Sequence, residues 1–199
     1  MVSCEHAVRR IGHERVASDD DLLHDRSPMI DPQVLGRGAP ALADELGTLT
    51  SVLDQQRTTV VRKLTGLSDA QARSRPVPTS TMTPMGLVRH LAAVERWWFS
   101  IDFAARGVTP PWPDGQPGRD GFELADDDTL ASSIALYVAE CAASRQVVAA
   151  SRGLDEPARQ PPDQAFNLRF ALVHMIQETA RHNGHLDLMR EAIDGSTGE

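Results

Sequence analysis

Cysteine is scarce in this chain, with only Cys4 and Cys141 among its 199 residues. The two form no Cys-x-x-Cys pair, and two such distant cysteines indicate no disulfide framework. Cys141 falls in helical step with the apolar residues between 130 and 148, so we interpret it as an inert core residue. This cysteine usage fits a reducing compartment, and we expect a cytoplasmic protein.

Long apolar runs are missing as well. None approaches the roughly 20 residues that a transmembrane helix needs, and the residues that follow Met1 lack the apolar core of a signal peptide. The net charge is −8 and no basic stripe is present, which argues against nucleic-acid binding by counterion release. We therefore expect neither a membrane nor a nucleic-acid partner.

Several enzyme signatures are also missing. The sequence contains no His-Glu-x-x-His, no Gly-x-Ser-x-Gly, no Walker loop and no Rossmann glycine pattern. A ferritin-like di-iron bundle needs two Glu-x-x-His motifs and two further glutamates. This chain instead has a single Glu-x-x-x-His, which excludes that site.

Helical periodicity is what the sequence does have, and strand-like alternation is missing. We predict an all-α fold, a four-helix bundle with at least one crossover connection. Residues 1–38 are charged and contain prolines and glycines, so we expect a loosely ordered N-terminal extension before a bundle domain over 39–199.

Capping residues set the expected helix limits. We predict helices over 40–64, 84–103, 126–151 and 166–194. Thr83 serves as N-cap before Pro84, acidic residues open the helix at Asp126, and Gly195 ends the last helix. A short capped turn is expected at Ser68.

The segment 107–125 is long for a connection inside a compact domain. It contains four prolines, four glycines and Trp112. This segment could be a loop that covers a site, or equally a surface loop without a function. As a cover, it would supply Trp112 and Phe122 as aromatic walls of a substrate pocket.

Glu178 and His182 are four residues apart on the last predicted helix, a spacing that lets both side chains reach one cation. On a helical wheel, His182 lies within the core stripe and Glu178 beside it. His185 is farther from the stripe and could be a substitute ligand or orient a ligand. His174 is farther still, and we expect it to be exposed or structural.

His90 is the only histidine of the apolar helix over 84–103 and could supply a third ligand. Two histidines, one glutamate and an open position are typical of a catalytic metal site. A lone histidine on an apolar face is, however, more often a hydrogen-bonded core residue. Arg169 or Arg181 could pair with Glu178 in place of a metal ion.

Three stretches carry a family resemblance: Leu64 to Asp69, Thr83 to Phe99, and His174 to Gly195. They resemble the DinB/YfiT-like superfamily, in the actinobacterial branch related to mycothiol-dependent enzymes. The resemblance implies an up-up-down-down four-helix bundle, often a homodimer, with a divalent metal ion held by three side chains. His90, Glu178 and His182 match the family's ligand positions. Where many relatives have glutamine, this chain has His185.

The resemblance and the ligand set together suggest a metal-dependent thiol S-transferase or isomerase that acts on a small electrophile. Zinc is the expected ion, with nickel, iron or manganese as alternatives, and a low-molecular-weight thiol of the mycothiol type is the expected cosubstrate. His185 and Glu95 are candidates for proton transfer. The alternatives are a non-catalytic, stress-related metal-binding bundle and a helical dimer without metal.

Overall fold

The computed structural model describes residues 43–110, 122–160 and 165–198. Within these ranges the chain is helical and has no strand beyond a single isolated bridge between Pro157 and Asn167. The all-α bundle is therefore confirmed. The expected N-terminal extension over 1–38 lies outside the described residues.

Four long helices form the bundle, each with a short polar side chain at its N-cap. Helix α1 spans Glu45–Leu64 with Asp44 as cap, and the short α2 spans Asp69–Arg73 with a capping box on Ser68. Helix α3 spans Pro84–Glu95 with the predicted Thr83 cap. Helix α4 spans Leu130–Ala149 and α5 spans Leu168–Asp194, which ends at Gly195 in the left-handed conformation with φ of 76°.

The second predicted helix changes its winding midway. After Glu95 the chain continues as a π-helix, η3, over Arg96–Phe103. A π-helix bonds residue i to i+5, so each residue advances by less around the axis than in an α-helix. Apolar spacing read at 3.6 residues per turn does not reveal such a change, and the sequence predicted only the outer limits of this helix.

The start of α4 was predicted four residues too early. Asp126 and Asp127 form a turn, and the helix begins after Thr129, whose hydroxyl accepts a hydrogen bond from the Ser132 backbone N–H in a capping box. Asp128 is held outside the helix because its carboxylate accepts from the backbone N–H of Ala125 and pairs with Arg89.

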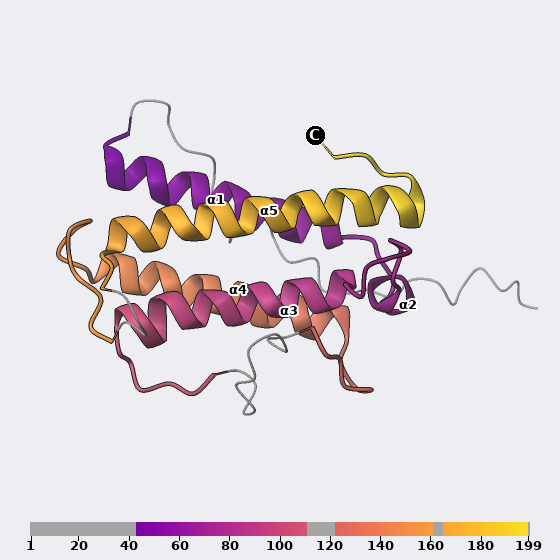
Figure 1. The fold of residues 1–199 in the computed structure, drawn as a ribbon, viewed down its shortest axis with the longest axis horizontal. Coiled ribbons are helices and arrows are strands. Elements are labelled where there is room, and N and C mark those ends of the chain that lie inside the picture. The colour runs from indigo at the N-terminus through magenta and orange to yellow at the C-terminus, as the bar shows by residue number, and fades with distance from the viewer. Residues whose placement is uncertain (1–42, 111–121, 161–164, 199) are drawn as a thin grey trace, which may run out of the picture.

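The helices lie in two parallel pairs, α1 with α5 and α3/η3 with α4 (Figure 1). Arg169 pairs with Glu45 near the start of α1, and Asp187 pairs with Lys63 near its end, so α1 and α5 run in the same direction. Chain order is therefore up, down, down, up. The expected up-up-down-down order is wrong, because only the connection between η3 and α4 crosses the length of the bundle.

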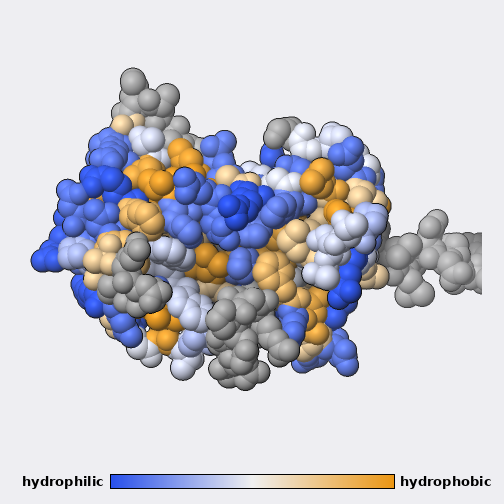
Figure 2. All heavy atoms as spheres, in the orientation of Figure 1, coloured by the Kyte–Doolittle hydropathy of each residue, from blue (hydrophilic) through white to orange (hydrophobic). Residues whose placement is uncertain are grey.

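Two apolar clusters fill the interior. One gathers around Tyr137, Leu87 and Leu186, and the other around Phe99, Leu168 and Met175. Cys141 is fully buried in the first cluster, as predicted. The face of the molecule seen in Figure 2 shows small apolar patches among hydrophilic residues. None of the described helices combines the length and apolar character that crossing a bilayer would require.

Candidate metal centre

The structure brings His90, Glu178 and His182 together at the contact between α3 and α5. One donor atom from each lies within 4.8 Å of the others. Glu178 Oε1 is 3.5 Å from His90 Nε2 and 3.0 Å from His182 Nε2. All three side chains are at least three-quarters shielded, with exposed fractions of 15%, 20% and 8%.

These distances fit a common metal ion. In a tetrahedral zinc site with bonds of about 2.0–2.1 Å, neighbouring ligand atoms are roughly 3.3 Å apart. The two separations above bracket that value. Two imidazole nitrogens and one carboxylate oxygen are also the donor set of catalytic zinc sites, which keep one position for water or substrate. The residues present therefore fit a divalent cation.

The surroundings favour the protonation states that ligands need. Burial lowers the pKa of His182, and His90 and His185 lower it further, against the opposing charge of Glu178. Burial alone would raise the pKa of Glu178, but its interactions with His182 and His90 outweigh that effect and lower it. Neutral imidazole beside an ionised carboxylate is the state that binds a metal ion.

His185 contacts the second nitrogen of His182. The two Nδ1 atoms are 3.3 Å apart, so the Nε2 of His182 faces Glu178 while its Nδ1 faces His185. In a metal-bound imidazole the other ring nitrogen carries the proton and donates a hydrogen bond, which fixes the ring. His185 is placed to accept that bond.

Phe122 covers His90. Their rings stack with centroids 4.5 Å apart and planes inclined by 21°. Gly86 permits this approach, since a Cβ there would lie 3.1 Å from the backbone oxygen of Phe122. Of the two aromatic walls expected from the long connection, Phe122 thus lies beside the centre. Trp112 lies outside the described residues.

Glu95 has a different environment from the one expected of a proton carrier. It is fully buried, and both of its carboxylate oxygens accept hydrogen bonds from the guanidinium of Arg57. This arrangement supports the interior of the bundle, and the geometry provides nothing that favours proton transfer. Arg169, considered above as a partner of Glu178, pairs with Glu45 and Asp155 instead.

Sequence reasoning missed an aromatic row on the same side of α5. His174 stacks on Trp98 of η3 at a centroid distance of 4.1 Å, and Phe166 and Phe170 are within 5.0 and 6.0 Å of the same indole. The spacing of four between Phe166, Phe170 and His174 was the available signal. His174 was expected to be exposed or structural, and its ring is half-buried in this row.

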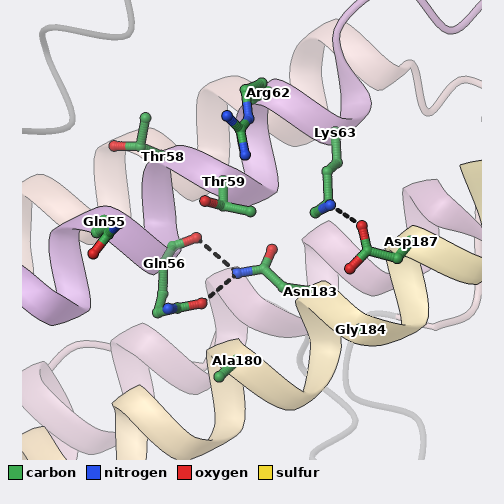
Figure 3. A pocket seen from close by; sticks show the side chains of 10 residues that line it. All are labelled: Gln55, Gln56, Thr58, Thr59, Arg62, Lys63, Ala180, Asn183, Gly184 and Asp187. Carbon is green, nitrogen blue, oxygen red and sulfur yellow. Dashed lines mark hydrogen bonds and ion pairs between the residues drawn. The ribbon is translucent and has the colours of Figure 1, made fainter. Parts of the chain in front are cut away.

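A separate polar pocket of about 550 Å³ lies in the seam between α1 and α5 (Figure 3). Asn183 Nδ2 donates to the backbone oxygen and to Oε1 of Gln56, and Lys63 pairs with Asp187. Asn183 and Asp187 face α1, whereas Glu178 and His182 face α3. The body of α5 therefore separates this pocket from the candidate metal centre.

The family model described as mycothiol-S-transferase matches residues 48–195, about three quarters of the chain. The crystal structure of a conserved protein from Enterococcus faecalis aligns with a TM-score of 0.56 and 16% identity, covering 77% of this chain and 99% of that one. At this identity the likeness shows the fold alone. A search of curated proteins gives no match.

Proposed function

Because the chain belongs to the mycothiol-S-transferase family, we propose that it joins a low-molecular-weight thiol of the mycothiol type to a small electrophile. The observation that carries this proposal is the convergence of His90, Glu178 and His182 within 4.8 Å. In the proposed site these three side chains hold one divalent cation, with zinc the preferred ion.

A divalent cation would supply positive charge that lowers the pKa of a nearby thiol, so that the reactive thiolate is present near neutral pH. In the transfer the thiol releases its proton to solvent water and its sulfur forms a bond to an electrophilic carbon. The leaving group departs with the electron pair of the bond that breaks. The charge and the positioning needed for this step are what the centre provides.

The chain's own residues prepare this chemistry. Glu178 lies between the Nε2 atoms of His90 and His182, and its interactions with both lower its pKa, which preserves a negatively charged oxygen for the cation. His185 Nδ1 accepts a hydrogen bond from the Nδ1–H of His182 and so keeps the Nε2 of His182 directed at the site. Phe122 shields the ring of His90 on one face and so limits the access of water.

The test begins with elemental analysis of the purified full chain, followed by chelator treatment and reloading with zinc. Consumption of mycothiol is then measured with a panel of alkyl halides and epoxides. We expect about one zinc ion per chain and zinc-dependent turnover. Glu178→Gln should lose both, whereas the matched change at an exposed position of the same helix, Glu191→Gln, should lose neither.

Other results would contradict the proposal in different ways. Zinc binding without turnover on any electrophile would favour the non-catalytic bundle, most clearly if zinc removal lowers the melting temperature. Failure of the wild-type chain to bind any divalent ion would leave the three side chains as a hydrogen-bonded cluster. Either outcome would end the transferase proposal.

A further inference from the structure

The aromatic row contains Phe166, which precedes α5, Phe170 and His174 of α5, and Trp98 of η3. Its rings pack against one another with centroid distances between 4.1 and 6.3 Å, and His174 is stacked on both Trp98 and Phe170. Phe170 is 54% exposed, although it belongs to this cluster. Soluble proteins have reason to bury an aromatic ring, because it carries a large apolar area. An open ring at the edge of a stacked cluster therefore provides a surface for a further flat, apolar group.

The row continues directly into the candidate metal centre. On α5 the series Phe170, His174, Glu178 and His182 advances by four residues at each step, so neighbours lie side by side about 6 Å apart along the axis. The facing series on α3 and η3 is His90, Val94 and Trp98. His90 contacts Glu178 at one end of this shared ridge, and Trp98 contacts His174 at the other.

The charge state of the aromatic row also favours an uncharged aromatic ligand. Burial lowers the pKa of His174, and the effect exceeds the opposing influence of Glu178, so the imidazole is neutral at physiological pH. Neutral imidazole, indole and phenyl groups stack well with aromatic molecules. No ionic partner is needed to hold such a molecule there.

We propose that the aromatic row is the binding site of the electrophile, and that the electrophile carries an aromatic ring next to its reactive carbon. The separation of about one helical turn between His174 and Glu178 matches a ring joined to a reactive centre by one or two atoms. This inference rests on the proposed function, because only that function makes the bound molecule an electrophile. The ring-binding surface itself can be tested without turnover.

A kinetic test compares benzyl chloride with allyl chloride, which share a leaving group and differ in the ring. In the zinc-loaded full chain, Phe170→Ala should lower kcat/KM for benzyl chloride by about five- to tenfold, mainly through KM, and leave allyl chloride within about twofold. Leu188→Ala is the matched control. Leu188 is 60% exposed on the same face of α5, about 27 Å further along, and its replacement should change neither substrate.

A binding test separates this inference from the function. Saturation-transfer NMR with benzyl alcohol, which is not electrophilic, should show contact with the wild-type chain that Phe170→Ala abolishes and Leu188→Ala retains. Allyl alcohol should show none. This result would support the row even if no thiol were consumed. If Phe170→Ala changed kcat/KM equally for both chlorides and left benzyl alcohol binding unchanged, the aromatic row would not be the binding site. The transferase proposal would still stand.

The row could instead be covered by a second copy of the chain. Sedimentation of wild type and Phe170→Ala tests that arrangement directly. A change of mass on substitution, with no benzyl alcohol signal in the wild type, would overturn the proposal. An unchanged mass together with the loss of the benzyl alcohol signal would support it.

Discussion

Arg57 of α1 and Glu95 of α3 form a two-point ion pair inside the bundle. Arg57 Nε and Nη2 lie 2.7 and 2.6 Å from the two oxygens of Glu95, and the side chains are 3% and 0% exposed. Arg57 also bonds Asp54 at 2.9 Å, and Asp54 pairs with Arg145 of α4. This network ties three helices together across the interior.

Removing one partner of that pair should be costly, since it leaves a buried charge without compensation. We expect Glu95→Ala to lower the free energy of unfolding by about 3–5 kcal/mol, measured by urea denaturation. Replacing both residues, Arg57→Met with Glu95→Leu, should recover most of the loss because no charge is then stranded. A loss no larger than that of Glu191→Ala at the surface would contradict this account.

Replacing Gly86 or Gly184 by alanine should change the stability of the protein in opposite directions. At Gly86 a Cβ would lie 2.9 Å from Thr83 Oγ1 and 3.1 Å from the Phe122 oxygen, whereas nothing lies within 4 Å at Gly184. Gly86→Ala should destabilise the protein by about 1–3 kcal/mol and displace Phe122 from His90. Gly184→Ala should stabilise it by about 0.5–1 kcal/mol. Urea denaturation of both variants checks the signs, and a stabilised Gly86→Ala would contradict the close packing.

His185 should set the strength of metal binding without being a ligand. Loss of an orienting partner typically weakens metal affinity by about 10–100-fold. We expect His185→Leu to show that loss in competition with a zinc-binding dye, and His185→Gln to restore most of it because an amide oxygen can accept a hydrogen bond from the Nδ1–H of His182. A larger loss that glutamine does not rescue would make His185 a ligand instead.

Asp102 of η3 should make stability depend on pH. Burial raises the pKa of its carboxyl to about 6, above roughly 3.9 in an unfolded chain. The folded state therefore holds this proton more tightly, and the contribution of Asp102 to stability falls as pH rises from about 4 to 6. Asp102→Asn should melt higher than wild type at pH 7, with the difference shrinking towards pH 4. Parallel thermal melts measure this, and a constant difference would contradict it.

The helices could be predicted from the sequence because their limits depend on local spacing. The Thr83 cap, the short capped turn at Ser68 and Gly195 follow from short-range chemistry. Periodicity and a family resemblance pointed to His90, Glu178 and His182, which lie within 4.8 Å of one another, and their role as metal ligands stays a prediction. The caps and helix limits need no knowledge of how distant segments meet.

Other features depend on contacts between distant segments. The partner of Glu95 is 38 residues away on α1, and spacing along α3 gives no sign of it. The stacking of Phe122 on His90 depends on where the connection returns, and only the small size of Gly86 hints at a close approach. The order of helix directions likewise depends on which connection crosses the bundle.

The burial of Cys141 has a consequence for a protein that would handle alkylating compounds. Such compounds attack any accessible thiolate, including one belonging to the catalyst. Burial and the nearby Glu95 raise the pKa of Cys141, and its sulfur is inaccessible to solvent. It is the one cysteine among the described residues, so this part of the chain offers an alkylating compound no exposed thiol.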